Sequence, residues 1–305
     1  SKTMTREVVT ISLANYEERQ QEIAQQLYRA AKDVGFFYIS DHGIPQEEVD
    51  HAFATGKSFL ELDKETKAHY PFNPDTYLGW RGPDELETVT GGRAPPRRRP
   101  CAAGDDFRNT ALAFQAKTHD VAVKILKALF LGLGWDPARI DDVSTRTERA
   151  AQNTSSLGSL SLRGHAAVPP RLHAHADMDV LTILFQRDDA VGLEIAPGNE
   201  DVGNIWNHVP VAREWTPLDP KPGHLTVNIG DGLTRWTDGV FKSTYHRVRA
   251  PKAGDPTGAR YSIPYFVNPK LNYSIQGPNK RWGPVTGFDL LSKTGERSWA
   301  GGAGS

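Results

Sequence analysis

The chain has 305 residues, enough for one large domain or two small ones with a sizeable hydrophobic core. Its 36 Lys and Arg residues almost cancel its 37 Asp and Glu residues, and the net charge of −1 argues against nucleic acid or an anionic membrane as a partner. A single cysteine, Cys101, excludes an intramolecular disulfide and a Cys-rich zinc site. With no membrane-length apolar run or N-terminal signal pattern, the sequence predicts a cytoplasmic protein that acts on a small molecule.

Strands and amphipathic helices alternate in the N-terminal part of the chain. Residues 7–13 alternate between apolar and polar side chains and include several β-branched residues, which predicts a strand. Apolar residues at helical spacing predict a helix over residues 17–34, and residues 36–40 (FFYIS) predict a second strand. A second helix is expected to begin at Pro45 or the residue after it, because proline is well tolerated near a helix start.

The middle of the chain changes character at residue 71. Residues 71–105 are rich in Pro, Gly and charged residues and lack a sustained period, so we interpret them as a long irregular connection. A third helix is predicted from about Phe107 to Leu133. We therefore expect residues 1–105 to form an N-terminal segment with an irregular pocket loop. Residues 106–305 would contribute the long helix and the β-rich core, and the two parts would form a single structural unit.

Short β-rich segments separated by turn residues follow Ser155. Such a series, with almost no helix between its members, predicts an antiparallel sandwich or barrel with the preceding helices packed outside. The fold class is therefore α+β, mainly β. The expected strands lie within residues 157–162, 180–186, 191–196, 224–230, 244–250 and 260–268.

Residues 173–184 (HAHADMDVLTIL) contain a dense group of possible metal ligands, which occupy every second position: His173, His175, Asp177 and Asp179. On an extended strand, residues two apart share a face and each residue advances about 3.3 Å. His173 and Asp177 are then about 13 Å apart, too far to bind one ion without a bend. The spacing leaves three pairs open: His173 with His175, His175 with Asp177, or Asp177 with Asp179.

Two other strands carry polar residues that fit the same kind of site. His246 lies near the start of a predicted strand, 69 residues after Asp177. On the last strand, alternate residues share one face: Arg260, Ser262, Pro264 and Phe266. An inward arginine is costly unless it meets an anion, and the planar guanidinium of Arg260 suits a carboxylate. Two histidines and one carboxylate that leave metal positions open are typical of non-haem Fe(II) oxygenases.

Three stretches, in order, resemble the 2-oxoglutarate-dependent Fe(II) oxygenases of the isopenicillin N synthase type: residues 175–195, 222–248 and 260–266. The N-terminal segment that ends in DHGIP at Pro45 is similar to the helical segment that precedes the barrel in the same family. The resemblance covers most of residues 7–270. It implies a double-stranded β-helix, or jelly-roll, core with N-terminal helices packed outside.

The resemblance also selects among the possible metal ligands. In the family, the HxD of the metal site is followed after three residues by Leu-Thr, and here Leu181 and Thr182 stand at that offset. His173 and Asp179 then fall outside the metal site. The implied Fe(II) ligands are His175, Asp177 and His246.

Further residues are implicated in binding the co-substrate and the substrate. Arg260 and Ser262 match the RxS motif that binds the far carboxylate of 2-oxoglutarate in the family. Phe266 occupies a position where family members often pack an aromatic ring against the substrate, and a plain core role is the alternative. His165 stands roughly where many members have a tyrosine that helps to bind the co-substrate, so this part of the 2-oxoglutarate site departs from the family pattern.

The implied activity is oxidation of an unactivated C–H bond of a small molecule by Fe(II), 2-oxoglutarate and O2, with hydroxylation, desaturation or oxidative rearrangement as the outcome. Specialised metabolism is the expected setting, and no catalytic side chain beyond the iron site is implied. An oxidase of the same fold that uses Fe(II) and O2 without 2-oxoglutarate is the closest alternative. A non-catalytic jelly-roll binding protein and a zinc hydrolase are the others, and neither explains an inward Arg–Ser pair beside the three ligands.

Overall fold

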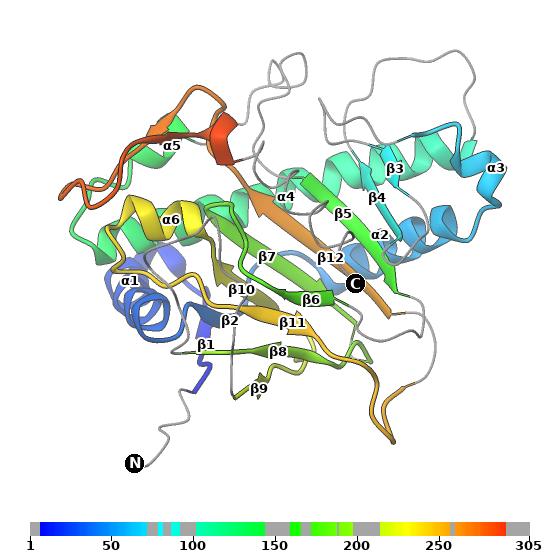
Figure 1. The fold of residues 1–305 in the computed structure, drawn as a ribbon, viewed down its shortest axis with the longest axis horizontal. Helices are drawn as coiled ribbons and strands as arrows, with labels where there is room; N and C mark the ends of the chain where they lie inside the picture. Colours follow the sequence, from blue (N-terminus) through cyan, green and yellow to red (C-terminus); the bar gives the residue numbers. More distant parts are fainter. Residues whose placement is uncertain are drawn as a thin grey trace, which may run out of the picture.

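Two large β-sheets, a two-stranded sheet and a layer of helices make up the part of the chain that the computed structural model describes (Figure 1). The described residues are 7–71, 79–81, 87–91, 102–143, 159–165, 172–187, 189–197, 214–256 and 260–290. The helices are α1 (Tyr16–Asp33), α2 (Gln46–Leu60), α3 (Lys64–Lys67), α4 (Ala102–Gly132), α5 (Arg139–Val143) and α6 (Asp231–Trp236). The strands are β1 (Thr10–Ser12), β2 (Phe36–Ser40), β3 (Gly79–Arg81), β4 (Glu87–Gly91), β5 (Ser159–His165), β6 (Leu172–His175), β7 (Leu181–Gln186), β8 (Leu193–Ile195), β9 (Thr216–Pro217), β10 (Leu225–Ile229), β11 (His246–Val248), β12 (Arg260–Val267), β13 (Ser274–Ile275) and β14 (Val285–Thr286).

The larger sheet has eight strands in the order β1-β2-β10-β7-β12-β5-β4-β3. Its pairs are antiparallel except for β1 with β2, which run parallel. The smaller sheet has the order β6-β11-β8-β9 and is antiparallel throughout. Strands far apart in the sequence are neighbours in both sheets, as in a jelly roll. A separate antiparallel pair is formed by β13 and β14. The two larger sheets are not joined into one among the described strands, so the core is a sandwich rather than a closed barrel, and the predicted fold class is confirmed.

Side chains of the larger sheet alternate between a helix-facing side and a side that faces the smaller sheet. Ile183, Val227 and Tyr265 belong to the large apolar core that α1, α2 and α4 complete. Leu184, one residue after Ile183, packs instead against a second cluster that includes residues of β8 and β11. Alternation therefore turns a set of polar residues toward the space between the sheets: Thr182, Gln186, Thr226, Asn228, Arg260 and Ser262.

The predicted N-terminal elements are confirmed with small shifts at their ends, but the interpretation of residues 71–105 is partly wrong. Within that range β3 and β4 form and extend the larger sheet, because β4 pairs with β5. The sequence of β4 is ETVTG, in which three β-branched residues stand in a row, a short strand signal outweighed by the Pro and Gly around it. The long helix α4 also begins at Ala102, five residues earlier than expected.

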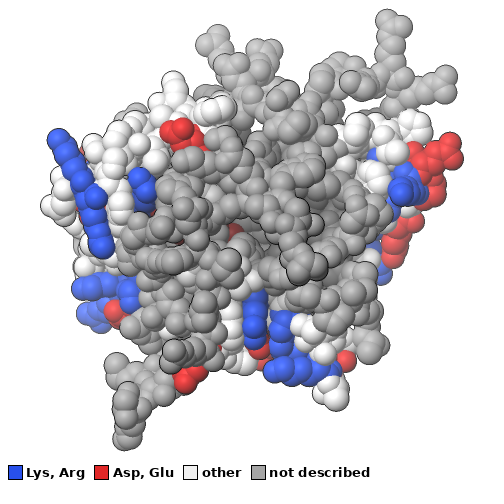
Figure 2. Space-filling view, in the orientation of Figure 1, with Lys and Arg blue, Asp and Glu red and all other residues white. Residues whose placement is uncertain are grey.

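The surface is mixed in charge where it is described. On the face shown in Figure 2, basic and acidic side chains both occur around the part of the surface that the structure does not describe. None of the helices among the described residues is both long enough and apolar enough to cross a membrane.

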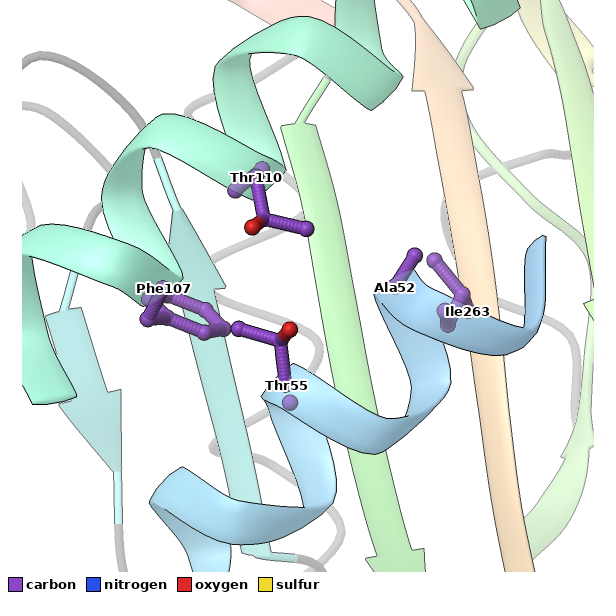
Figure 3. Close-up of a pocket in the computed structure, with 7 residues that line it drawn as sticks. Ala52, Thr55, Phe107, Thr110 and Ile263 are labelled. Atoms are coloured by element: carbon purple, nitrogen blue, oxygen red, sulfur yellow. The ribbon is translucent and has the colours of Figure 1, made fainter. Parts of the chain in front are cut away.

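A small cavity of about 20 Å³ lies between α2, α4 and β12, on the helix side of the larger sheet (Figure 3). A void of this size holds about one water molecule. Ile263, which lines it, points away from the face that carries Ser262, so the cavity is separate from the space between the sheets. The lining residues are Ala52, Thr55, Gly56, Phe107, Thr110, Ala111 and Ile263.

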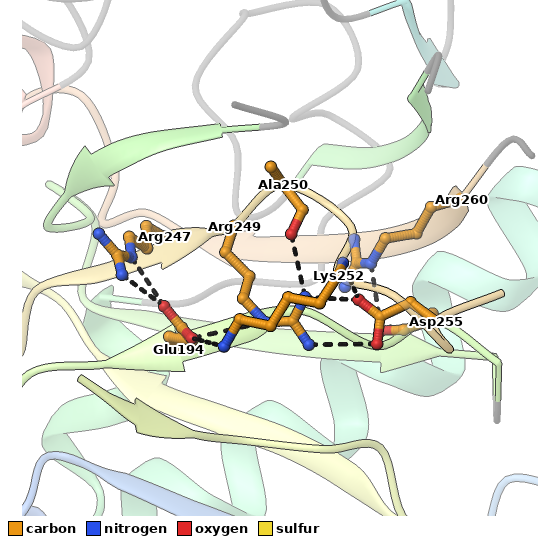
Figure 4. Close-up of polar contacts among 8 residues, drawn as sticks. Glu194, Arg247, Arg249, Ala250, Lys252, Asp255 and Arg260 are labelled. Carbon is orange, nitrogen blue, oxygen red and sulfur yellow. Dashed lines mark hydrogen bonds and ion pairs between the residues drawn. The ribbon is translucent and has the colours of Figure 1, made fainter. Parts of the chain in front are cut away.

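Charged side chains hold the connection between β11 and β12 against the smaller sheet (Figure 4). Glu194 on β8 is buried, and its carboxylate accepts a hydrogen bond of 2.8 Å from Nε of Arg247. Arg249 donates to the Asp255 carboxylate at 2.5 Å, and the backbone N–H of Lys252 donates to the same group at 2.7 Å. These contacts fix the turn over residues 249–255 that follows β11.

We expect Phe185→Ala to destabilise the fold strongly. The Phe185 side chain is 2% exposed, and the centroid of its ring lies 4.8 Å from that of the Phe114 ring on α4. Truncation therefore leaves a cavity between the sheet and the helix layer. Such a change costs about 3–5 kcal/mol. Urea unfolding measures the loss, with Phe288→Ala as the matched control, because Phe288 is 60% exposed and should change stability by less than about 0.5 kcal/mol. Equal effects of the two changes would contradict the assigned packing.

The Arg249–Asp255 pair should make a pH-dependent contribution to stability. The hydrogen bond from Arg249, aided by the backbone N–H of Lys252, lowers the pKa of Asp255 to about 2. Because the folded pKa is depressed, the stabilisation is present above the ordinary aspartate pKa and is lost as the pH falls toward 2. Asp255→Asn should therefore lower the melting temperature at pH 7, and the difference from wild type should shrink between pH 5 and pH 3. A difference that stays constant over this range would contradict the assignment.

Candidate functional site

The chain passes from one sheet to the other within the histidine-rich stretch, so residues 173–184 do not form the single extended strand on which the ligand spacing was considered. β6 ends at His175 in the smaller sheet, and β7 begins at Leu181 in the larger one. Asp177 lies on this crossover, and its backbone carbonyl accepts a hydrogen bond of 2.8 Å from the N–H of Asp231. The crossover carries Asp177 out of the strand register that the sequence suggested and places it between the sheets.

The backbone of β6 contains one extra residue relative to its partner β11. His246 lies opposite His175, and Val248 lies opposite Leu172, so the stretch between the paired residues is one residue longer on β6. Such a bulge interrupts the alternation of side chains. His173 lies within this interrupted stretch, so the sequence argument that placed it on the face of His175 does not hold, and its side chain lies outside the described residues.

Ligand atoms of His175, Asp177 and His246 converge within 4.8 Å of one another. Asp177 Oδ1 is 3.6 Å from Nε2 of His175 and 3.8 Å from Nε2 of His246. Both distances exceed those of a hydrogen bond. They are short enough for the carboxylate to share one ion with either imidazole, because two ligands that each lie about 2.0–2.2 Å from an ion are at most about 4.4 Å apart. No other group of three such ligands converges among the described residues.

Backbone and ring contacts fix the orientation of the His246 ring. Its Nδ1 lies 3.3 Å from the carbonyl oxygen of Thr244, which favours a proton on Nδ1 and leaves the lone pair of Nε2 available to bind a metal. Phe36 packs edge-on against the ring, with 5.4 Å between the ring centroids. His246 is 7% exposed, so little water competes with its ring contacts on this side of the site.

The Asp177 carboxylate is buried and its two oxygens have different surroundings. Oδ2 accepts hydrogen bonds from the Thr182 hydroxyl at 2.6 Å and from the Asn228 amide at 2.8 Å, whereas Oδ1 faces the two imidazoles. Burial alone would raise the pKa of this carboxyl. The adjacent His246 and His175 rings and the two hydrogen bonds outweigh burial and lower the pKa to about 2. The group is therefore an anion at neutral pH and can act as a metal ligand.

Asp179 is buried beside this group but does not converge with it. Its Oδ2 lies 3.0 Å from the Thr182 hydroxyl, and its Oδ1 has no hydrogen-bond partner within the described part of the chain. Burial and the neighbouring charge of Asp177 raise the pKa of Asp179 well above its usual range. Gly230 packs against it so closely that a Cβ there would lie 2.2 Å from the Asp179 carbonyl oxygen, which explains the glycine.

Arg260 and Ser262 are buried on the face of β12 that the sequence predicted. Arg260 donates from Nη2 to the side-chain oxygen of Gln186 at 2.8 Å and from Nε to the carbonyl of Ala190 at 3.1 Å. Gln186 in turn donates to the hydroxyl of Thr226 at 3.1 Å. A chain of polar contacts thus crosses three neighbouring strands and fixes the guanidinium.

The two remaining candidates lie on neighbouring strands of the larger sheet. Phe266 is half-buried and its backbone lies opposite that of Thr182, beside the metal-ligand group. The backbone of His165 lies opposite that of Arg260, and its side chain lies outside the described residues. Neither assignment to substrate binding is tested by these contacts.

Sequence reasoning missed three polar residues of the site, although a signal was present for each. Thr226 and Asn228 alternate with Leu225, Val227 and Ile229 along β10, and polar residues at alternate positions of a buried strand indicate a polar interior face. Gln186 ends the apolar run of β7 on the same face as Thr182. Their partners could not be identified without the pairing of the strands.

Two protein families match the chain, one in each half. Residues 7–99 match the N-terminal family described as non-haem dioxygenase in morphine synthesis, and residues 161–269 match the 2OG-Fe(II) oxygenase superfamily. The second match spans every residue of the converging group together with Arg260 and Ser262.

Curated relatives cover most of the chain. Validamycin A dioxygenase of Streptomyces hygroscopicus subsp. limoneus is 30% identical over 285 residues, which cover 83% of this chain and 73% of the relative. The 2-oxoglutarate-dependent dioxygenase traH of Penicillium crustosum is 26% identical over 300 residues, covering 87% of this chain and 85% of the relative.

Solved structures agree on the fold. A full-length Neurospora crassa protein, solved in complex with alpha-KG and thymine, superposes with a TM-score of 0.79 at 22% identity, and the match covers 95% of this chain and 97% of that protein. A 2OG-Fe(II) oxygenase family protein from Caulobacter crescentus gives a TM-score of 0.76 at 23% identity, with coverage of 96% and 99%. The converging His-Asp-His group and both family matches lead to one conclusion: the chain belongs to the 2OG-Fe(II) oxygenase superfamily, as a dioxygenase that uses Fe(II), 2-oxoglutarate and O2.

Proposed function

We propose that His175, Asp177 and His246 are the Fe(II) ligands of this enzyme. The observation that carries the proposal is the convergence of their three ligand atoms without hydrogen bonds among them. Two imidazole nitrogens and one carboxylate oxygen are the donor set typical of non-haem Fe(II) oxygenases. The donors fit the ion in charge as well, because the Asp177 carboxyl is ionised at neutral pH.

Arg260 and Ser262 are proposed to bind the far carboxylate of 2-oxoglutarate. Burial supports this role, since a buried guanidinium favours an anion and its fork suits a carboxylate. The contacts to Gln186 and Ala190 hold the guanidinium in one orientation before the co-substrate arrives, which lowers the entropic cost of binding.

The bound iron, with 2-oxoglutarate and O2, supplies the oxidising chemistry that attacks a C–H bond of the substrate. The protein's own residues bind and orient the reactants. The Asp177 carboxylate provides a fixed negative charge, and the Thr244 carbonyl keeps the His246 ring in place. Apolar side chains of Phe36 and Leu184 face the space between the sheets and help to exclude water from the site.

The substrate is proposed to be a small molecule of specialised metabolism, oxidised by hydroxylation, desaturation or rearrangement at an unactivated C–H bond. The names of the relatives support this class, because validamycin A and thymine are both small molecules. Phe266 and His165 are the proposed substrate-side residues, on the basis of the register that sets the backbone of Phe266 opposite Thr182 and that of His165 opposite Arg260. The cytoplasmic location and the boundary between residues 105 and 106 stay predictions.

Anaerobic addition of Fe(II) and 2-oxoglutarate should produce a weak visible metal-to-ligand charge-transfer band that requires both additions. His246→Ala and Asp177→Asn should abolish the band, because each removes one of three ligands. The matched control is His69→Ala, since His69 is exposed and its ring contacts the backbone carbonyl of Thr66, away from the three ligands. A band of wild-type intensity in His246→Ala would contradict the metal assignment.

Arg260→Ala should leave Fe(II) binding intact and weaken 2-oxoglutarate binding. Removing one partner of a buried charge pair costs about 2–5 kcal/mol. The measurement is a titration of the charge-transfer band with 2-oxoglutarate, together with succinate formation under O2. Arg187→Ala is the control, because the Arg187 side chain is 49% exposed. Unchanged 2-oxoglutarate affinity would contradict the assignment of Arg260, and turnover without succinate would identify an oxidase of the same fold.

A further inference from the structure

Two hydrogen-bond donors reach the same oxygen of the Asp177 carboxylate. The Thr182 hydroxyl donates to Oδ2 at 2.6 Å, and the Asn228 amide donates to Oδ2 at 2.8 Å. A carboxylate oxygen has two lone pairs, so two donors satisfy it fully. Oδ1 receives neither of these bonds and faces His175 and His246.

The two donors are rigidly placed by the larger sheet. Thr182 on β7 and Asn228 on β10 lie directly opposite each other in the antiparallel register. Thr182 is 3% exposed and Asn228 is 4% exposed, so water does not replace either donor easily. Side chains at such cross-strand positions are close neighbours on one face. The hydrogen bonds to the carboxylate therefore come from two adjacent strands rather than from a loop.

The backbone around Asp177 is held by the segment that follows β10. The N–H of Asp231 donates to the Asp177 carbonyl at 2.8 Å, and the N–H of Gly232 donates to the Asp179 carbonyl at 2.9 Å. The chain from Asn228 to Gly232 thus contacts both the side chain and the backbone of the crossover. Because the backbone is already fixed, loss of the Oδ2 bonds should change mainly the rotation of the carboxylate about its side-chain bonds.

We propose that Thr182 and Asn228 are positioning residues that lock the Asp177 carboxylate with Oδ1 toward His175 and His246. The proposal rests on the assignment of these three residues as metal ligands. Neither positioning residue touches the metal-facing oxygen. Their role is to fix the rotation of the Asp177 carboxylate before the ion binds, so that less rotational freedom is lost on binding. Partners of this kind typically contribute about 10–100-fold to metal affinity.

The test is a binding isotherm for Mn(II), a redox-stable divalent ion, on the full chain without co-substrate, in which EPR measures the free ion. Thr182→Val and Asn228→Leu keep the approximate shape of the side chain and remove the donor. Each should raise the Kd for Mn(II) by about 10–100-fold. Thr182→Ser keeps the hydroxyl and should restore a Kd within about threefold of wild type, as expected of a conservative replacement that retains the hydrogen bond.

A matched control separates positioning from a general structural role. Thr237 is a buried threonine whose hydroxyl donates to the backbone carbonyl of Leu233, away from Asp177. Thr237→Val removes a comparable hydrogen bond and should leave the Kd unchanged. Thermal unfolding of each variant without metal, and then with saturating Mn(II), gives a second readout. The metal-induced rise in melting temperature should be smaller in Thr182→Val than in Thr237→Val at the same Mn(II) concentration.

Failure of this inference can be told apart from failure of the proposed function. If wild type binds Mn(II) and His246→Ala does not, the metal site stands. Wild-type Mn(II) affinity in both Thr182→Val and Asn228→Leu would then overturn the positioning role alone. If His246→Ala binds Mn(II) as tightly as wild type, the ligand assignment itself is wrong, and the positioning role falls with it.

Discussion

Burying the negative charge of Asp177 is the constraint on which the interior of this protein depends. A carboxylate removed from water must be compensated by hydrogen bonds and opposite charge. Two adjacent strands supply the hydrogen bonds, through Thr182 and Asn228, and the proposed metal ion would supply the charge. The larger sheet is therefore more than a support for the site, since its strand pairing creates the environment in which the carboxylate can stay ionised.

The two faces of the larger sheet show how the same strands serve stability and function. On the helix side, apolar residues of β7, β10 and β12 join α1, α2 and α4 in one large core. On the other side, polar residues lie next to each other across the strands and pair into two groups, one around Asp177 and one around Arg260. A substitution on the helix side is expected to change folding stability, whereas one on the other side is expected to change binding.

Most of the fold and the key candidate residues could be predicted from the sequence. Periodicity identified α1, β2 and α2, and the face of β12 followed from simple alternation. The path through residues 173–184 could not be predicted, because the change of sheet between His175 and Leu181 depends on long-range pairing. The bulge at His173 likewise depends on the register with β11. The partners of Asp177 and Arg260 lie on strands tens of residues away, and local patterns do not identify such neighbours.

Strand β10 contributes one residue to each of the two polar groups and so fixes the distance between them. Thr226 belongs to the group around Arg260 and Asn228 to the group around Asp177, and the two residues are neighbours on one face of a single strand. Residues two apart on a strand are separated by about 6.6 Å. The strand thus sets the distance between the end of the site that contains the Asp177 carboxylate and the end that contains the Arg260 guanidinium. A slip of β10 by one residue would turn both polar side chains toward the helices and put Val227 in their place, so the two ends of the site would be lost together.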